Sequence, residues 1–248
     1  SIRRQRQMCI RDSTKITRYS NPSGLIDGFY AGKYVGEIWG YETIGIAQSD
    51  QEMAEHIGRL INGGQSNLGQ DWKAGDIMYK DLNEDGKIDA GSHTLQDHGD
   101  LKRIGNSTPR YNVGLELAAD WKGFDIRMFW QGTLKRDYFQ GSYYFWGANG
   151  RQGPWFSTAL KGHDDYFRND EASPLGTNLN SYYPRPLFNT DKNQQSQTKY
   201  LQDASYLRLK NLQIGYSLPH NIVQKMGMQH LRIFASGENL FTITSLID

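Results

Sequence analysis

The sequence predicts an all-β fold with long loops between its strands. Over residues 111–131, apolar and polar residues alternate on both sides of a Lys122-Gly123 turn, the pattern of two half-buried strands joined as a hairpin. The alternation returns over residues 204–217 and 231–243. No run reaches 18 apolar residues, so the sequence offers no transmembrane helix, although alternating strands are compatible with a membrane β-barrel.

Composition narrows the function classes. The chain has 248 residues, which suits one or two domains or part of a larger protein, and it shows no signal-peptide pattern. Its net charge of +1 gives no electrostatic reason to expect a nucleic-acid partner. With 15 Tyr, 27 Gly and a mean hydropathy of -0.71, it is not a helical membrane protein.

The first 13 residues, SIRRQRQMCIRDS, are basic and without period. They contain the single cysteine, Cys9, which therefore has no partner for an internal disulfide. The string QMCIRDS is similar to translated sequencing-adapter read-through, so we expect residues 1–13 to be non-native and take residues 14–248 as the domain. An ordinary basic N-terminal segment is the alternative.

A short helix is expected before the strands. Residues 24–48 are aromatic and punctuated by glycine, which suggests short strands or extended segments. Ser49 and Glu52 then form a capping-box pattern, and apolar residues recur at helical spacing as far as Ile61. This predicts a helix over about residues 51–61, ended by Asn62-Gly63-Gly64.

Residues 75–110 carry the strongest chemical motif. The spacing D-x-N-x-D-G-x-I over residues 81–88 matches the first half of an EF-hand-type calcium loop, in which oxygens at alternate positions converge on one hard cation. A backbone carbonyl at position seven and a carboxylate at position nine would extend the set. The candidate calcium ligands are Asp81, Asn83, Asp85, Lys87 through its carbonyl, and Asp89.

The second half of the calcium motif is missing. Position twelve, a bidentate Glu in an EF-hand, is Ser92, and no helical pattern flanks the loop. The last ligand would have to be Asp89, Asp97, Asp100 or water. We therefore expect an isolated calcium loop outside the EF-hand family; the alternative is a turn cluster of Asp, Asn and Gly without a metal.

The hairpin over residues 111–131 has strands of about ten residues, a length that crosses a bilayer when tilted. Aromatic residues lie at the strand ends, where interface girdles would be. A soluble sandwich has the same alternation, so the hairpin alone leaves both architectures open. The apolar band of a barrel would run through Val113, Leu115, Leu117, Ile126, Met128, Leu231 and Ile233.

Residues 135–199 are loop-like, because four prolines forbid a continuous sheet there. Loops of this length are usually functional or disordered, and the many aromatic residues argue against disorder. Their side chains could stack on sugar rings or contact a partner protein, or they could pack on one another. The candidates are Tyr143, Tyr144, Trp146, Trp155, Tyr182 and Tyr183.

The last two alternating segments have irregularities. In residues 204–217, the apolar phase switches between Leu209 and Leu212, which predicts a β-bulge near Lys210-Asn211. Pro219 ends this strand, and residues 220–227 could form one helical turn. In the final strand, Phe234 and Leu240 break the alternation.

The sequence shows no catalytic constellation, so we expect a protein that is not an enzyme. His163, Asp164 and Asp165 lie in a loop without a Ser or Cys nucleophile pattern, and adjacent carboxylates are weak evidence for glycosidase chemistry. The six His residues show no zinc spacing.

Four ordered stretches carry a family resemblance. They are GDIMYKDLNEDGKID, IGNSTPRYNVGLELAADWKGFDIRMFWQG, YLRLKNLQIGYSLP and LRIFASGENLFTIT, preceded by VGEIWGYETIGI. In order and approximate spacing they resemble SusC/RagA-type TonB-dependent outer-membrane transporters of Bacteroidetes. The resemblance covers about residues 28–244.

The resemblance implies a partial antiparallel transmembrane β-barrel, a late segment of a roughly 22-stranded barrel, with long extracellular loops. The plug and the final strands of the family are not matched. It further implies an importer of oligosaccharides or peptides in the cell outer membrane, in contact with lipid, energised by TonB–ExbB–ExbD and covered by a SusD-like surface lipoprotein. The acidic residue before the family's I-G-N motif corresponds best to Asp100, which makes Asp100 the candidate late calcium ligand.

A second function from another class fits the same alternation. A secreted β-sandwich that binds carbohydrate with calcium would also need half-buried strands and an acidic loop. Sandwich strands are mostly five or six residues long, whereas the best strands here have about ten, which favours the barrel.

Overall fold

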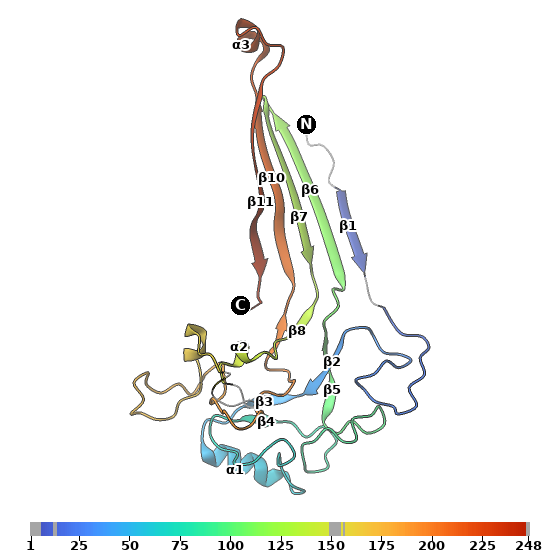
Figure 1. Ribbon diagram of the computed structural model, residues 1–248, viewed down its shortest axis with the longest axis vertical. Helices are drawn as coiled ribbons and strands as arrows, with labels where there is room; N and C mark the ends of the chain where they lie inside the picture. Colours follow the sequence, from blue (N-terminus) through green and yellow to red (C-terminus); the bar gives the residue numbers. More distant parts are fainter. Residues whose placement is uncertain (1–5, 12–13, 149–154, 156, 247–248) are drawn as a thin grey trace. The chain divides into compact units, whose positions relative to one another are not determined.

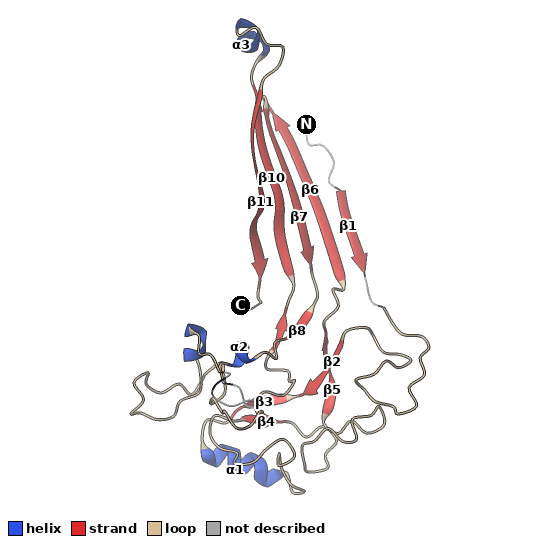
Figure 2. Cartoon of the chain, viewed as in Figure 1, coloured by secondary structure: helices blue, strands red, loops and turns tan. Residues whose placement is uncertain are grey.

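The computed structural model describes residues 6–11, 14–148, 155 and 157–246, and the chain divides into two compact units. The sheet unit comprises residues 1–14, 107–138 and 202–248, and the loop unit comprises residues 15–106 and 139–201. Long strands make up most of the sheet unit (Figure 1). Loops with short strands and helices make up most of the loop unit (Figure 2).

The sheet unit holds a five-stranded antiparallel sheet in the order β1-β6-β7-β10-β11. As predicted, the β6–β7 hairpin turns at Lys122 and Gly123, whose φ angles of 45° and 87° are both positive. The predicted helical turn after Pro219 is α3 (His220–Lys225), between β10 and β11. The strands are β1 (Arg6–Arg11), β6 (Tyr111–Trp121), β7 (Phe124–Thr133), β10 (Tyr206–Ser217) and β11 (Arg232–Thr244).

Residues 6–11 form an additional strand, β1, at the edge of the sheet. The segment that was excluded from the predicted fold pairs along β6, with Arg6 opposite Glu116 and Arg11 opposite Tyr111. The edge of β6 presents unpaired amide and carbonyl groups, and a neighbouring extended segment can satisfy them whatever its origin. That residues 1–13 are non-native stays a prediction; residues 1–5 and 12–13 lie outside the described part of the chain.

The register places apolar side chains from four strands on one face of the sheet. Across the sheet, Leu117 lies opposite Met128, which lies opposite Leu212, and the neighbouring rows follow the same order. The predicted band residues of β6, β7 and β11 lie on this face, and Leu231 lies immediately before β11. The apolar face comprises Val113, Leu115, Leu117, Ala119, Trp121, Phe124, Ile126, Met128, Trp130, Leu207, Leu209, Leu212, Ile214, Tyr216, Ile233, Ala235, Phe241 and Ile243.

The predicted bulge in β10 is confirmed, and it explains the phase switch. The pairing of β10 with β7 passes directly from Leu209–Trp130 to Asn211–Phe129, so Lys210 is the extra residue. One extra residue reverses the alternation. As a result the leucines before the bulge and the apolar residues after it all lie on the apolar face.

Leu240, which breaks the alternation of β11, also belongs to the apolar face. The pairing with β10 skips Asn239 and Leu240, and Asn239 has a positive φ of 52°. A Cβ placed on Gly237 would lie 2.7 Å from Leu240 Cδ2. The Leu240 side chain therefore lies over Gly237, which faces the apolar side opposite Leu212.

The opposite face is mainly polar and carries an ion pair, although Phe129 and Phe234 also lie on it. Arg232 donates from Nε to Asp125 Oδ2 at 2.9 Å and from Nη2 to Asp125 Oδ1 at 2.5 Å, a two-pronged pair across β11 and β7. Arg208 Nε donates to Thr242 Oγ1 at 2.8 Å on the same face. The sheet thus separates apolar from charged side chains across its thickness.

The loop unit contains short two-stranded ladders. β2 (Glu37–Tyr41) pairs with β5 (Leu101–Asn106), and β3 (Thr43–Ile46) pairs with β4 (Ile77–Tyr79). β8 (Asp137–Phe139) pairs with β9 (Leu201–Asp203). The helices are α1 (Asp50–Arg59), α2 (Tyr143–Trp146) and the 3-10 helix η2 (Lys161–Asp164). In the described part of the chain, no helix is both long and apolar enough to cross a membrane.

Helix α1 forms close to the predicted position. Ser49 Oγ accepts from the Glu52 amide at 3.1 Å, while Glu52 Oε2 accepts from the Gln48 amide at 2.7 Å, so the reciprocal bond reaches one residue further back than in a capping box. Met53 is the buried anchor of its inner face. The helix ends earlier than predicted: the Leu60 amide caps it, and Ile61 is 83% exposed.

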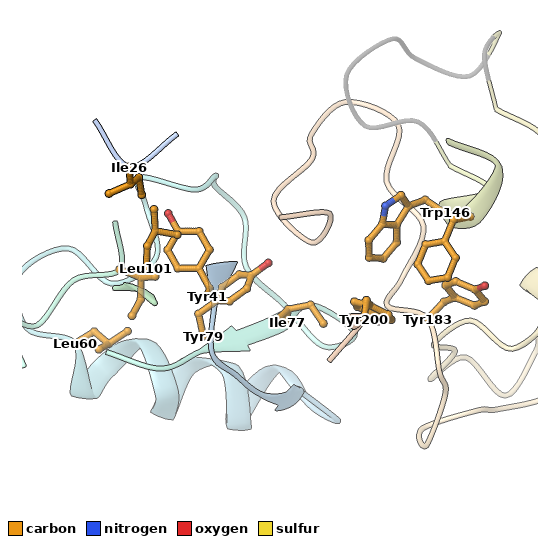
Figure 3. Close-up of a cluster of buried hydrophobic side chains, with 11 residues drawn as sticks. Ile26, Tyr41, Leu60, Ile77, Tyr79, Leu101, Trp146, Tyr183 and Tyr200 are labelled. Atoms are coloured by element: carbon orange, nitrogen blue, oxygen red, sulfur yellow. The ribbon is translucent and has the colours of Figure 1, made fainter. Parts of the chain in front are cut away.

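Aromatic side chains build much of the core of the loop unit. Tyr79 and Tyr200 are fully buried, and Tyr79 lies 5.3 Å from the ring of Tyr41. The Tyr79 hydroxyl donates to the Lys192 carbonyl at 2.7 Å, so this buried polar tip has a partner. Figure 3 shows this core, in which side chains from residues 26–101 and from residues 145–200 share one cluster.

Candidate functional site

The predicted calcium loop lies between β4 and β5 and consists of short hydrogen-bonded turns. Asp81 accepts from the amides of Glu84 at 2.7 Å and Gly86 at 2.8 Å. Asn83 Oδ1 accepts from the Asp85 amide, and Asp85 Oδ1 accepts from the Lys87 amide, each within 3.2 Å. The side-chain oxygens at positions one, three and five therefore fix the backbone of their own loop.

Lys87 supplies a cation to the same loop. Its Nζ lies 2.6 Å from Asp89 Oδ2 and 3.7 Å from Asp85 Oδ2. The hydrogen bond with Lys87 lowers the pKa of Asp89, and the same bond raises the pKa of Lys87. Two of the predicted carboxylate ligands thus have an internal counter-ion.

Asp100 connects the two ends of the loop. It is fully buried, and its carboxylate accepts from the Leu82 amide at 2.7 Å and the Asp89 amide at 2.9 Å. Burial raises the pKa of Asp100, although these amide bonds oppose the rise. No group of three His, Cys, Asp or Glu side chains in the described residues is arranged to hold a metal, and calcium binding stays a prediction.

The candidate aromatic residues divide into buried and exposed sets. Trp146 and Tyr183 are 7% and 8% exposed, and Tyr182 packs against the same cluster. Trp146 contacts Tyr200 edge to face at 4.6 Å between ring centroids. Packing within the loop unit, the alternative weighed from the sequence, accounts for these three residues.

Tyr143, Tyr144 and Trp155 are exposed. The Tyr143 and Tyr144 ring centroids lie 4.2 Å apart with the ring planes tilted by 36°, and Trp155 is 85% exposed. Exposed aromatic surface of this kind suits contact with a ligand or partner. Their role as partner residues stays a prediction.

His163 serves the fold of its loop. The Leu160 amide donates to His163 Nδ1 at 2.9 Å, and His163 Nε2 lies 3.0 Å from the Phe145 carbonyl. Asp165 Oδ1 accepts from Asn178 Nδ2 at 2.8 Å. Both nitrogens of the imidazole are thus in hydrogen bonds to the backbone.

A buried ion cluster joins two distant segments of the loop unit. Asp76 is fully buried and lies 2.7 Å from Arg185 Nη2 and 2.9 Å from Lys192 Nζ. Asn193 Nδ2 donates to Asp76 Oδ1 at 2.8 Å. Burial alone would raise the pKa of Asp76, but the bonds from Arg185, Asn193, Lys192 and the Lys73 amide outweigh it and lower the pKa.

A pocket of about 260 Å³ lies beside this cluster. Trp146 and Tyr183 line it together with Pro184, Pro186 and Phe188. The stretch SYYPRPLF, dense in aromatic residues and proline, was the available signal. The pocket itself depends on tertiary contacts that the sequence pattern does not show.

No family model matches the chain. It is 30% identical over 213 residues to TonB-dependent receptor P3 of Formosa agariphila, covering 86% of this chain and 18% of that protein. TonB-dependent receptor P39 of the same organism is 22% identical over 251 residues, covering 88% of this chain and 23% of that protein. The chain thus spans about a fifth of the length of the relatives that it matches.

Solved structures share the fold. One structure of the RagAB peptide transporter superposes with a TM-score of 0.54 at 21% identity, covering 88% of this chain and 20% of that one. The RagAB peptide importer in its closed-closed state superposes with a TM-score of 0.52 at 18% identity, covering 93% of this chain and 22% of that one. The sequence relatives, the shared fold and the four ordered motifs agree: the chain resembles a segment of SusC/RagA-type TonB-dependent transporters.

Proposed function

We propose that this chain is part of an importer in the cell outer membrane, and that its sheet is a section of the membrane-spanning barrel wall. The observation that carries the proposal is the division of the sheet into an apolar face and a mainly polar face with an ion pair. A barrel wall needs this arrangement, because one face meets lipid and the other lines the lumen.

The dimensions of the sheet support this reading. β6 has 11 residues. At about 3.4 Å per residue and a tilt of about 45°, such a strand rises roughly 26 Å along the membrane normal. The apolar band of such barrels is about 25 Å tall.

Aromatic pairs lie on the apolar face toward both ends of the strands. Phe124 and Tyr216 have ring centroids 4.5 Å apart next to the short turn, and Trp130 and Phe241 have centroids 5.3 Å apart toward the other end. Amphipathic and aromatic rings are enriched at the two membrane interfaces of β-barrels.

The substrate and partners are proposed from the family resemblance. We propose that the importer carries an oligosaccharide or a peptide, that a SusD-like lipoprotein covers it, and that TonB–ExbB–ExbD energises it. A peptide transporter among the solved structures with this fold supports the peptide option. No bond making is assigned to the chain, so it is not an enzyme in this proposal.

We also propose calcium as a structural ion of the residue 81–89 loop. The all-oxygen donor set fits a hard cation. Asp81, Asn83 and Asp85 hold the loop in the turn conformation that would present these oxygens, and a cavity of about 300 Å³ lies beside Asp81 and Asp85. Bound calcium would have to compete with Lys87 for the carboxylate of Asp89.

Fractionation of the full-length parent protein tests the proposed function. We expect recovery from outer membranes only after detergent extraction, together with a surface lipoprotein. We also expect a deletion strain to lose uptake of one class of oligosaccharide or peptide. Recovery as a soluble monomer would overturn the proposal.

The soluble sandwich is the weaker candidate. Its apolar face would have to be covered by a second sheet, yet Trp121, Ile233 and Ile243 are 68%, 62% and 59% exposed. Large exposed apolar side chains on one face of a sheet suit contact with lipid.

A further inference from the structure

A second pocket of the loop unit has polar walls. Its volume is about 410 Å³, and its lining comes from residues 26–41, 90–101 and 195–196. Most of the lining side chains carry a polar group. Pockets that bind small molecules have volumes of about 300–1,000 Å³, and a few polar groups fix the orientation of the ligand. The polar groups that remain open to a ligand therefore decide what this pocket can hold.

The charged side chains of the wall already have partners within the protein. Lys33 Nζ donates to two backbone carbonyls, each at 2.8 Å. Glu37 Oε2 accepts from the Tyr30 hydroxyl at 2.7 Å, and Asp27 Oδ2 lies 2.9 Å from His93 Nε2. An ionic ligand would meet charges of both signs that are already compensated, so the wall favours a neutral ligand.

The hydroxyl of Tyr41 is the deepest open group. Tyr41 is 4% exposed, and its hydroxyl makes no hydrogen bond among the described residues. The oxygen is not one of the fully enclosed side-chain atoms that lack a partner in this part of the chain, so it keeps accessible surface. Figure 3 shows Tyr41 beside Ile26 and Leu101, which line the same pocket. Burial raises the pKa of Tyr41, and the carboxylates of Asp100 and Asp89 add to the rise, so the hydroxyl stays protonated and can both donate and accept.

Two further open groups lie on the segment that is bonded to Tyr41. The Tyr41 amide donates to the Ser196 carbonyl at 2.8 Å, which holds the two residues together. Ser196 Oγ donates to the Trp39 carbonyl at 2.8 Å, so it can only accept a further bond. Gln195 Nε2 donates to the Asp191 carbonyl at 3.1 Å, which leaves Oε1 as an acceptor. A ligand that satisfies these groups must bring several hydrogen-bond donors.

A sugar ring matches this donor requirement and the size of the pocket. Adjacent hydroxyl groups on one ring each donate and accept, whereas a peptide backbone supplies one N–H per residue at intervals of about 3.4 Å. The C–H face of the ring can pack on an aromatic side chain, and the half-buried Trp39 lines the pocket. A cavity of about 150 Å³ holds benzene, so about 410 Å³ leaves room for a ring with its hydroxyl groups.

We propose that this pocket binds a neutral sugar ring of an oligosaccharide substrate, with the Tyr41 hydroxyl bonded to a hydroxyl of the ring. The proposal rests on the proposed import function and selects oligosaccharide over peptide at this site. Tyr41 is then a specificity-determining residue, and Gln195 and Ser196 accept from the remaining hydroxyl groups.

The test uses the detergent-purified full-length parent transporter and isothermal titration calorimetry. The probes are linear hexasaccharides of glucose, mannose, galactose and xylose, together with an N-acetylated alanine pentapeptide. We expect at least one hexasaccharide to bind with a Kd below about 1 mM and more tightly than the peptide.

Two matched variants assign the binding to this pocket. Y41F keeps the ring of Tyr41 against Tyr79 and removes only the hydroxyl, so we expect it to weaken the tightest hexasaccharide by about three- to tenfold. Y166F is the control, because Tyr166 lines the pocket beside Asp76 and does not line this one. We expect Y166F to leave the affinity unchanged.

Three results would overturn the inference: no hexasaccharide binds the parent more tightly than the peptide does, Y41F binds as tightly as the parent, or Y166F weakens binding as much as Y41F. Circular dichroism of Y41F shows whether the variant has kept its fold, and the comparison of probes on the unmodified parent does not depend on any variant. Failure of the import function is a separate outcome, because it would appear as a parent protein that does not fractionate with the outer membrane.

Discussion

An arginine on the apolar face of the sheet gives the sharpest test of the barrel wall. Leu117 lies near the middle of β6, half-buried and opposite Met128. Near the midplane of a bilayer, an Arg on the lipid face of a β-barrel costs about 2–4 kcal/mol. We therefore expect L117R to lower the folded-to-unfolded ratio of the full-length parent by about 30- to 1,000-fold.

The neighbouring residue supplies the control. Glu116 is exposed on the polar face, opposite Phe129, so E116R places the same side chain one residue away on the other face. Surface substitutions of this kind are usually within about 0.5 kcal/mol of neutral. L117R and E116R place the guanidinium at nearly the same position along β6 but on opposite faces of the sheet.

The measurement is guanidinium-induced unfolding of the parent in lipid vesicles, followed by tryptophan fluorescence, with abundance in the outer membrane as a second readout. L117R should lower the unfolding midpoint and the abundance, and E116R should change neither appreciably. If both variants cost the same, or E116R costs more, the assignment of the faces is wrong.

Three further predictions concern the bulge, the buried ions and the calcium loop. Deleting Lys210 should prevent membrane assembly, because β10 would then turn the apolar residues before and after the bulge to opposite faces of the sheet. Heat-modifiable gel mobility measures assembly, and K210A should assemble normally. A deletion variant that assembles well would contradict the bulge. D76N should destabilise the parent by about 3–5 kcal/mol in thermal unfolding, because the buried Lys192 and the partly exposed Arg185 lose their counter-ion. The pKa of Asp76 is lowered in the folded state, so the stability that its carboxylate contributes is complete above the ordinary carboxyl pKa of about 3.9 and is lost as the pH falls through the lowered pKa. If D76N and the parent lose stability identically as the pH falls, this role of Asp76 is refuted. Millimolar calcium should raise the melting temperature of the parent relative to EGTA, and D85N should abolish the rise; identical curves for the parent would count against calcium binding.

Local patterns in the sequence predicted the strands well. The β6–β7 hairpin and its turn follow from alternation around Lys122-Gly123, because residues two apart share a face of a strand. The bulge at Lys210 followed from the phase switch between Leu209 and Leu212. Both features depend on neighbours along the chain, so the sequence contains the information needed to predict them.

Features that depend on distant contacts were less accessible. Trp146 and Tyr183 were candidates for a partner surface, but they are buried against Tyr200, a contact that no local pattern records. Asp100 was assigned as a possible metal ligand through the family resemblance, and its carboxylate accepts the amides of Leu82 and Asp89. Hydrogen bonds from loop backbone are not encoded in residue spacing.

The sequence by itself determined the mainly β class, the strand periods, the helix cap at Ser49 and the family resemblance, because each of these depends on short-range order along the chain. Only the tertiary structure decided which aromatic residues are buried, which carboxylates bind backbone amides, and that Asp76 joins Arg185 and Lys192 across more than a hundred residues of chain. Those outcomes depend on which segments meet when the loops pack. The free energy of packing is shared among side chains that are far apart in the sequence.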